Sequence, residues 1–365
     1  MKFISLKIGV RKDRYVYFDA HVTLMLFLVL LMLMIVLAMA KESVMPKYFF
    51  SDQITIFNIM KFAYDFQPGS SYTSTAYFYK LLGFEQSSVV FAMLSSLLIM
   101  TTYVFILIKV KGGELNLLDL GVFLFFVFLS VVNLTWQSKD FIVFLVMLPS
   151  LLMFASPRIG LAVWTLGALL FAYYFRTYWF LFVLEFYGLL IASRFISSAK
   201  TLVVLCLLSM LVLAVAVQVA LGVDVDAFRT SVNEIRLDRE GDGSNTLITP
   251  WVPGGNPLLG WINISITWFT FFFPFPLIVM LSPYYLIISL FIIMMFTRIW
   301  TILHRVLRSR GAYPLLRIFS LMVIAFTVIQ SMFEPDYGSY LRHLGPLYPF
   351  MFYVYLSFGK VNKEN

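Results

Sequence analysis

Long apolar runs alternate with short polar segments along almost the whole chain. A helix rises 1.5 Å per residue, so about 20 apolar residues cross the hydrocarbon core of a bilayer. Runs close to this length predict membrane-spanning helices at 22–40, 87–108, 117–135, 140–156, 159–175, 177–193, 201–222, 277–300, 316–333 and 339–358. We therefore expect an all-α polytopic membrane protein, a single integral membrane domain over 1–365 with about 10 to 11 transmembrane helices.

The composition excludes a soluble globular protein. Hydrophobic residues make up 61% of the chain and charged residues only 13%, whereas soluble domains carry roughly 25% charged residues. The single cysteine, Cys206, excludes a disulfide framework, and the histidines are scattered at His21, His304 and His343. We expect neither a metal site nor another cofactor, and no nucleic-acid partner.

A basic tail precedes the first apolar run. Lysine and arginine accumulate in cytoplasmic segments, and the tail contains Lys2, Lys7, Arg11, Lys12 and Arg14. We therefore expect 1–21 to be a cytoplasmic tail. The run 22–40 ends in small residues, as a signal peptide does, but it is longer than the usual h-region of about 7–15 residues. We interpret it as the first transmembrane helix.

Two long segments, 41–86 and 223–276, separate the apolar runs, and the second contains an ambiguous aromatic stretch. If 259–281 crossed the membrane, the basic residues between Arg298 and Arg317 would lie outside, against the positive-inside rule. Prolines also interrupt this stretch. We interpret 251–276 as interfacial or re-entrant and leave open whether 259–281 crosses. Both termini and a basic loop, 301–316, are then expected in the cytoplasm.

This topology collects the polar segments on one face, which we expect to be the outward face of the membrane. Those segments are the loop 41–86, the turns 135–140 and 175–178, the loop 223–276 and the loop 334–343. Lys139, Arg176 and Arg342 are then outward cations at interface depth, where the positive-inside rule disfavours them. An anionic ligand at that depth would account for all three. Snorkelling side chains, or an ion pair of Lys139 with Asp140, are the alternative.

The segment 225–245 has the spacing of an amphipathic helix. Apolar residues recur at three- and four-residue intervals from Val225 to Ile235, and a second stripe contains Arg229, Asn233 and Arg236. A helix on the membrane surface would direct Arg229 and Arg236 toward a ligand or the headgroups. The alternative is a solvated charged face.

The segment FEPDYGSYLRHLGPLYPF (333–350) places four charged or titratable groups between the last two apolar runs. Ser339 can cap a helix that begins at Tyr340, which would put Arg342 and His343 in the first turn. Helix N-termini favour phosphate, and arginine binds phosphate oxygens with two parallel hydrogen bonds. The alternative is a Glu334–Arg342 pair that joins two helix ends.

Several groups could accept a proton from a sugar hydroxyl. They are Glu334, Asp336, His343, and Asp52 and Asp65 of the first long loop. Glu185 lies within an apolar run, and such acids are functional or paired across helices.

The topology and three motifs, SKDF (138–141), FRTY (175–178) and EPDYGSYLRH (334–343), resemble the Wzy-type O-antigen and capsular polysaccharide polymerases. The Arg-x10-Gly loop motif described for that family is poorly matched, since eleven residues separate Arg229 from Gly241. The resemblance implies a GT-C-like glycosyltransferase of the bacterial inner membrane, with its active site on the periplasmic face. It would polymerise undecaprenyl-pyrophosphate-linked repeat units into O-antigen or capsule, without a metal.

The resemblance also implies roles and partners. Donor and acceptor glycans would both be linked to undecaprenyl pyrophosphate, and a chain-length regulator and a flippase would be functional partners. His343, Glu334, Asp336 and Asp52 would be the catalytic candidates. The substrate ligands would be Lys139, Arg176, Arg229, Arg236, Tyr340 and Arg342. The alternatives are a GT-C monosaccharide transferase, an O-antigen ligase or, from a different class, a lipid-linked oligosaccharide flippase or transporter.

Overall fold

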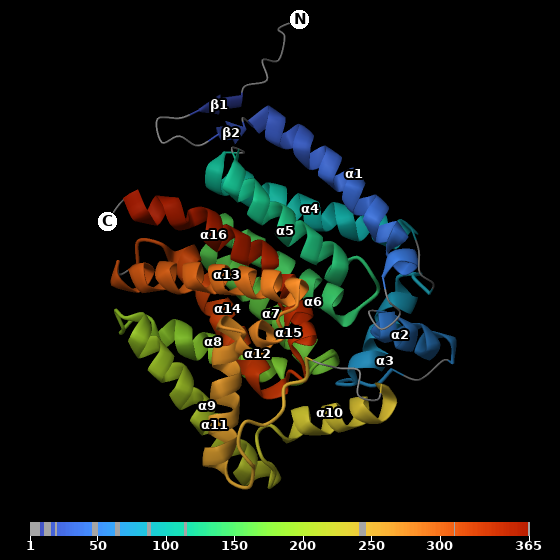
Figure 1. The fold of residues 1–365 in the computed structure, drawn as a ribbon, viewed down its shortest axis with the longest axis vertical. Helices are drawn as coiled ribbons and strands as arrows, with labels where there is room; N and C mark the ends of the chain where they lie inside the picture. The colour runs from blue at the N-terminus through green and yellow to red at the C-terminus, as the bar shows by residue number, and fades with distance from the viewer. Residues whose placement is uncertain are drawn as a thin grey trace, which may run out of the picture. The chain divides into compact units, whose positions relative to one another are not determined.

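The computed structural model describes residues 8–10, 16–18, 20–45, 50–62, 66–85, 89–112, 115–240, 246–309 and 311–363. Helices dominate these residues, and three short strands form the only sheet described among them (Figure 1). The all-α polytopic fold class is therefore confirmed. The chain divides into two compact units, which we describe separately: unit 1 is Met1–Trp179 with Gly345–Gly359, and unit 2 is Phe180–Leu344 with Lys360–Asn365.

Unit 1 is built from long apolar helices with two short helices inserted after the first. Its helices are α1 (Ala20–Val44), α2 (Ser51–Lys61), α3 (Ser71–Leu81), α4 (Val89–Lys111), α5 (Leu117–Leu134), α6 (Lys139–Met147), the 3-10 helix η2 (Leu148–Phe154), α7 (Pro157–Tyr174), the 3-10 helix η4 (Gly345–Leu347) and α16 (Tyr348–Lys363). α1 packs on α4 and α5, α2 packs on α3, and α6 packs on α7 and η4. The expected periplasmic loop 41–86 thus contains α2 and α3.

The small sheet shows which helix ends of unit 1 lie together. It contains β1 (Ile8–Val10), β2 (Val16–Phe18) and β3 (Leu115–Asn116), all antiparallel, in the order β1-β2-β3. β2 precedes α1, whereas β3 lies between α4 and α5. The start of α1 and the end of α4 therefore lie at one end of unit 1, and the expected tail 1–21 contains two strands.

Unit 2 surrounds one strongly buried helix, α14. Its helices are α8 (Trp179–Ala192), α9 (Ala199–Leu221), α10 (Ala227–Glu240), α11 (Pro257–Phe272), α12 (Phe275–Val279), α13 (Pro283–Arg308), α14 (Pro314–Phe333) and α15 (Tyr337–Leu344). α14 packs against α11, α13, α10 and α9. In α14, 89% of the residues in an apolar stretch of 18 are buried, against 22% in the corresponding stretch of α9. α14 is therefore a core helix, whereas α9 presents most of its side chains outward.

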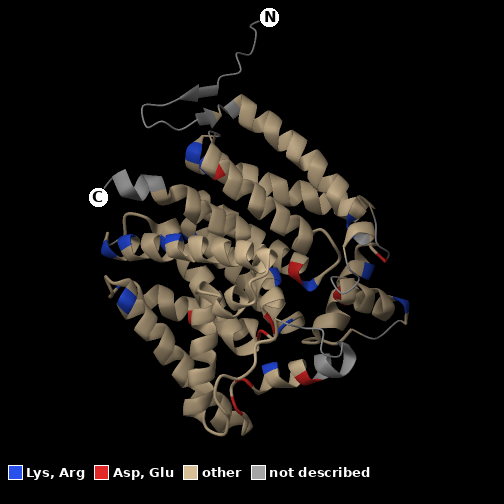
Figure 2. Cartoon of the chain, viewed as in Figure 1, with Lys and Arg blue, Asp and Glu red and all other residues tan. Residues whose placement is uncertain are grey.

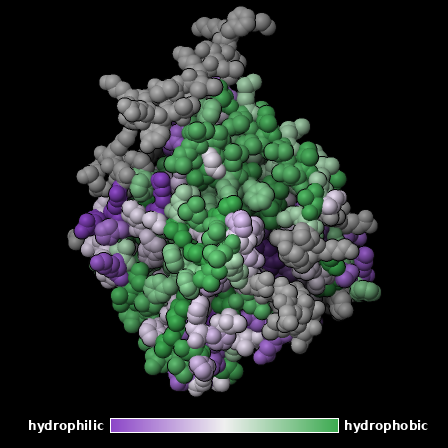
Figure 3. Space-filling model, in the orientation of Figure 1, coloured by the Kyte–Doolittle hydropathy of each residue, from purple (hydrophilic) through white to green (hydrophobic). Residues whose placement is uncertain are grey.

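Six helices in the described part of the chain are long and apolar enough to cross a membrane: α1, α4, α5, α9, α13 and α14. α8 and α11 are shorter apolar helices. Apolar side chains also cover much of the surface in Figure 3, and exposed ones such as Leu24, Leu28 and Met32 line α1. Large exposed apolar surfaces are incompatible with water on all sides, so this is a membrane protein.

Several predicted spans differ from the helices observed. The run 140–156 is α6 followed by η2, because Pro149 cannot continue the hydrogen-bond ladder of an α-helix. The run 339–358 is divided between α15, η4 and α16 for the same reason, at Gly345 and Pro346. α13 begins at Pro283 and continues to Arg308, so the expected basic loop 301–316 is wrong over 301–308. The segment 251–276 contains α11, a helix of 16 residues that packs on α9 and α14.

Candidate functional site

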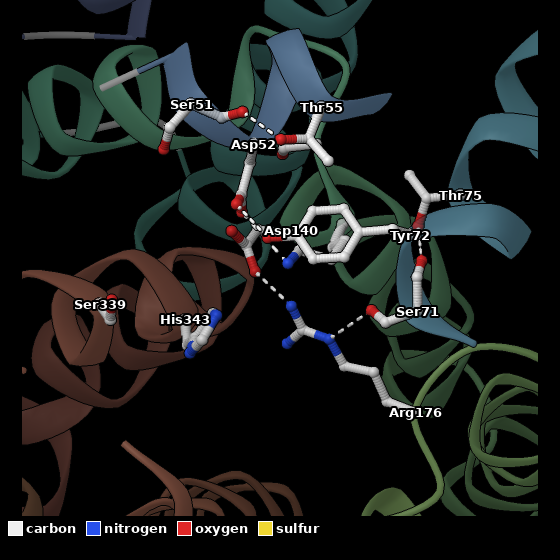
Figure 4. A network of polar contacts seen from close by, with 12 residues as sticks. Ser51, Asp52, Thr55, Ser71, Tyr72, Thr75, Asp140, Arg176, Ser339 and His343 are labelled. Atoms are coloured by element: carbon white, nitrogen blue, oxygen red, sulfur yellow. Dashed lines mark hydrogen bonds and ion pairs between the residues drawn. The ribbon is translucent and has the colours of Figure 1, made fainter. Parts of the chain in front are cut away.

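In unit 1, two cations and two carboxylates meet where three helices begin or end (Figure 4). Asp52 lies in the first turn of α2, Lys139 and Asp140 begin α6, and Arg176 follows α7. Ser138 caps α6 by accepting a hydrogen bond from the Phe141 N–H at 3.2 Å. We call Asp52, Tyr72, Lys139, Asp140 and Arg176 the lysine–arginine cluster.

Each cation of this cluster contacts a carboxylate and a further polar or aromatic group. Lys139 Nζ lies 3.3 Å from Asp52 Oδ2 and 3.7 Å from the centre of the Tyr72 ring. The Tyr72 hydroxyl donates to Asp52 Oδ1 at 2.6 Å. The structure therefore pairs Lys139 with Asp52, a contact that the loop sequence alone did not indicate.

Arg176 occupies the second half of the cluster. Its Nη2 lies 3.7 Å from Asp140 Oδ1, and its Nε donates to the Ser71 hydroxyl at 3.4 Å. Its Nη1 donates to the Tyr178 hydroxyl at 3.0 Å. The Arg176 and Lys139 side chains are 8% and 10% exposed, so both cations are almost withdrawn from water. A partly dehydrated cation binds a phosphate oxygen more strongly than a fully hydrated one, because the local dielectric constant is low.

The turn before α6 is held by residues that the sequence analysis did not single out. The Tyr79 hydroxyl donates to the Ser138 carbonyl at 2.8 Å, and Gln53 donates to the Gln137 amide oxygen at 3.0 Å. Burial raises the pKa of Tyr79 well above its ordinary value, so the hydroxyl keeps its proton for this bond. Lys41 of α1 donates to the Thr135 carbonyl at 2.6 Å. Because their partners lie 59, 84 and 94 residues away along the chain, no local pattern marks them.

In unit 2, Glu334 and His343 form a contact between the end of α14 and α15. Glu334 Oε1 contacts His343 Nδ1; Glu334 is buried, and the His343 side chain is 14% exposed. A carboxylate that accepts from Nδ1–H leaves the lone pair on Nε2. The structure therefore joins Glu334 to His343, the two residues that sequence analysis offered as separate candidates.

The predicted start of the helix after Asp336 is wrong. α15 begins at Tyr337, and Arg342 and His343 lie in its last turn, so the expected anion site at a helix start does not form there. Asp336 is the cap: its carboxylate accepts from the Ser339 N–H at 2.7 Å and from the Ser339 hydroxyl at 2.8 Å. An antiparallel bridge between Asp336 and Leu247 also holds this turn. Such a bridge, between segments distant in sequence, cannot be recognised from local spacing.

Arg229 points into unit 2 and is fully buried. It donates to the Thr267 hydroxyl at 3.2 Å and to the Ser331 carbonyl at 3.0 Å, and it lies 3.3 Å from Asp226. Burial lowers the pKa of Arg229, an effect that the Asp226 carboxylate opposes. The segment forms the predicted helix, α10, but Arg229 and Asn233 face inward while Phe228 is 55% exposed. Neither a ligand-facing nor a solvated orientation describes Arg229.

The remaining candidates have different surroundings. Tyr340 is fully buried and stacks on Phe271, with ring centres 3.8 Å apart and planes 7° apart. Its hydroxyl donates to the Phe271 carbonyl at 3.3 Å, so the geometry favours a packing role. Glu185 accepts a hydrogen bond from Ser209 of α9 at 2.9 Å, which gives this acid a partner across two helices. Asp65 and the Arg236 side chain lie outside the described residues.

One open cavity of about 490 Å³ lies beside the start of α10. Its lining includes Asp224, Asp226, Thr230, Ser231 and Glu234. Hydroxyl and carboxylate groups of this kind can bind sugar hydroxyls, and Asp224 already accepts from the Gly255 N–H at 2.8 Å.

Among the described residues, no group of three or more histidine, cysteine, aspartate or glutamate side chains could hold a metal ion. Comparisons with protein-family models, with curated proteins and with solved structures found no significant match to this chain.

Proposed function

We propose that this chain is a glycosyltransferase of the bacterial inner membrane. It would join oligosaccharide repeat units, carried on undecaprenyl pyrophosphate, into O-antigen or capsular polysaccharide at the periplasmic face. The observation that carries the proposal is the contact between Glu334 and His343. An acid that orients a histidine through Nδ1 and leaves Nε2 basic is the arrangement that activates hydroxyl nucleophiles.

His343 is the general base in this proposal, and Glu334 is its positioning residue. The acceptor sugar hydroxyl gives its proton to His343 Nε2 while its oxygen attacks the anomeric carbon of the donor glycan. The bond from that carbon to the lipid pyrophosphate breaks, and the pyrophosphate leaves with the electron pair. Attack opposite the leaving group inverts the configuration at the anomeric carbon.

Lys139 and Arg176 support the lipid-pyrophosphate part of the proposal. Both are nearly buried and lie at the ends of apolar helices. Charge that develops on a leaving pyrophosphate is stabilised by cations already positioned in a poorly hydrated site. Asp52 and Asp140, which hold these cations in the structure, would keep them oriented. Arg342 is a further candidate phosphate ligand, and a chain-length regulator and a flippase are the proposed functional partners.

The distribution of basic residues supports the proposed orientation. Lys109 and Lys111 end α4, at the same end of unit 1 as the N-terminal strands. Arg305 and Arg308 end α13 of unit 2. Placing these basic helix ends in the cytoplasm follows the positive-inside rule. This choice places the cytoplasmic N-terminus beside the end of α4.

The test is the length of surface polysaccharide in cells that carry His343→Gln, Arg176→Gln or Arg342→Gln in place of the wild-type protein. We expect loss of long chains while single-repeat glycans still reach the surface. The loss of a general base lowers transfer roughly 10²- to 10⁴-fold. His21→Gln and Arg158→Gln, at exposed positions, are the matched controls and are expected to keep wild-type chains.

Other outcomes separate the alternatives. If no glycan reaches the surface although lipid-linked repeats accumulate inside, a flippase explains the phenotype. If long lipid-linked chains form but are not transferred, a ligase does. Glycans that lack one sugar would indicate a monosaccharide transferase. Wild-type chain lengths in all three variants, with equal protein levels, would contradict the proposed site.

A further inference from the structure

One end of unit 2 concentrates positive charge, and no acid lies among the described residues of the helix ends that form it. Four helix ends meet there: the end of α8, the start of α9, the end of α13 and the start of α14. The Ala199 N–H at the start of α9 lies 3.4 Å from His304 Nδ1 in α13, which joins two of these ends directly. The basic residues that the structure describes at these helix ends are Arg194, Lys200, Arg305, Arg308 and Arg317. Figure 2 shows lysine and arginine in blue on the cartoon of the chain. No aspartate or glutamate occurs in 191–222 or in 283–333.

Two of these cations come from different helices and repel each other. Arg194 follows α8, Arg317 lies one turn into α14, and the charge of Arg194 acts against that of Arg317. Arg194 is exposed and Arg317 half-buried. The Arg317 Nε is buried and has no hydrogen-bond partner among the described residues. This donor is available to a ligand that binds at the helix end, because buried donors are normally paired.

The helix termini add to the same field. Helix N-termini carry partial positive charge and are stabilised by anions. α9 and α14 both begin at this end, yet their first turns contain no acid, and Lys200 and Arg317 lie there instead. The rule that basic residues stay cytoplasmic explains their presence at this end. That rule does not explain why two arginines, Arg194 and Arg317, lie near each other on separate helices.

We propose that this end of unit 2 binds the phosphodiester headgroup of an anionic phospholipid, with Arg194 and Arg317 as its ligands. The guanidinium groups supply paired N–H donors for two phosphate oxygens. Basic pockets between helix ends at the membrane surface suit such headgroups, and adjacent α9, which is largely exposed along its apolar length, offers a surface for the acyl chains. The site is separate from the residues proposed for glycosyl transfer.

The experiment uses the full-length protein in a neutral detergent. Thermal unfolding and native mass spectrometry are followed while short-chain phosphatidylglycerol, phosphatidylcholine or inorganic phosphate is added. We expect phosphatidylglycerol to raise the unfolding temperature and to remain bound in the spectrometer, whereas phosphatidylcholine does neither. In Arg194→Gln/Arg317→Gln, the dissociation constant for phosphatidylglycerol should rise roughly thirtyfold.

The matched control is Lys61→Gln/Lys80→Gln, which removes the same charge from exposed ends of α2 and α3. It should keep wild-type affinity. Equal loss in the control would show non-specific attraction and overturn the proposal. Equal stabilisation by inorganic phosphate would show a free-anion site rather than a lipid site. If the double variant does not fold, Arg194→Gln alone, at an exposed position, must still weaken phosphatidylglycerol binding for the proposal to stand.

Discussion

Arg176 in unit 1 and Arg229 in unit 2 have similar chemistry but different surroundings. Arg229 is fully buried, and an acid three residues away, a threonine hydroxyl and a backbone carbonyl accept from or contact its guanidinium. Arg176 retains some exposure, and its Nη2 lies 3.7 Å from the Asp140 carboxylate. The difference shows that an arginine in a polar segment between apolar helices is evidence for a ligand only after its contacts inside the protein are known.

The largest expected effect is on stability, from Arg229→Ala. The variant leaves Asp226 buried without its cation, and breaking a buried ion pair costs about 3–5 kcal/mol. Thermal unfolding of the purified protein measures this loss. Arg229→Met/Asp226→Leu removes both charges and should recover most of the stability. A stable Arg229→Ala protein that makes only short glycans would show that Arg229, like Arg176, acts on the substrate, and would contradict the structural role given to Arg229.

Arg176→Ala should lower activity more than it lowers stability, the opposite of Arg229→Ala. We expect the transfer rate to fall roughly 10²- to 10³-fold, as when a donor to a developing negative charge is removed. The unfolding temperature should change less than in Arg229→Ala. Initial rates with lipid-linked repeat units measure the first effect. Arg176→Lys keeps the positive charge but loses the paired N–H donors of the guanidinium group, so an intermediate transfer rate is expected. A stability loss equal to that of Arg229→Ala would end the distinction between the two arginines.

Two substitutions of Asp336 distinguish a helix-capping role from a catalytic one. Asparagine can also cap a helix, so Asp336→Asn should keep both the stability of unit 2 and the transfer rate. Asp336→Ala should lose about 1 kcal/mol of stability, because the Ser339 N–H loses its acceptor. Chemical unfolding and rate measurements on both variants provide the test. An inactive but stable Asp336→Asn protein would instead identify Asp336 as catalytic.

Substitution of Tyr337, which lies beside Arg229, is expected to have a small effect on stability at neutral pH. Its hydroxyl contacts Thr270 Oγ1 at 2.8 Å, so Tyr337→Phe should lose only about 1 kcal/mol. Burial raises the pKa of Tyr337 to about 12, while the Thr270 bond and the Arg229 charge lower it. The unfolded tyrosine ionises near pH 10. Between these values the unfolded chain releases a proton that the folded chain keeps, so wild-type stability falls as pH rises.

This pH dependence has a direct readout. Tyr337→Phe lacks the ionisable group, so its deficit relative to the wild type should shrink above pH 10 and then change sign. Unfolding curves of the two proteins at matched pH values measure the difference. A constant difference from pH 7 to pH 12 would contradict the raised pKa of Tyr337.

Much of the fold follows from local sequence. The bilayer acts as a solvent that requires about 20 apolar residues per crossing, so the runs containing α1, α4, α5, α9, α13 and α14 could be recognised without a structure. The amphipathic spacing also predicted α10. The shorter helices after α5 and the breaks near Pro149 and Pro346 were less clear, because apolar composition continues through them.

The candidate site was predictable only in part. Their predicted outward position and their residue types singled out Lys139, Arg176, Glu334 and His343, all of which lie in polar clusters. The partners were not predictable: Tyr79 contacts the turn before α6 from 59 residues away, and a Thr246–Ile248 segment holds the turn before α15. Contacts at such separations depend on packing and leave no periodic pattern.

Helix formation and membrane insertion depend on local composition and length, so the amino-acid sequence was enough to predict a helical membrane protein with polar side chains at particular helix ends. Which of those side chains have hydrogen-bond partners inside the protein depended on how the helices pack. This packing buried Arg229, made Asp336 a cap and joined Glu334 to His343. These outcomes depend on hydrogen-bond partners from distant segments, such as Ser331, 102 residues from Arg229, and such partners become neighbours only when the helices pack.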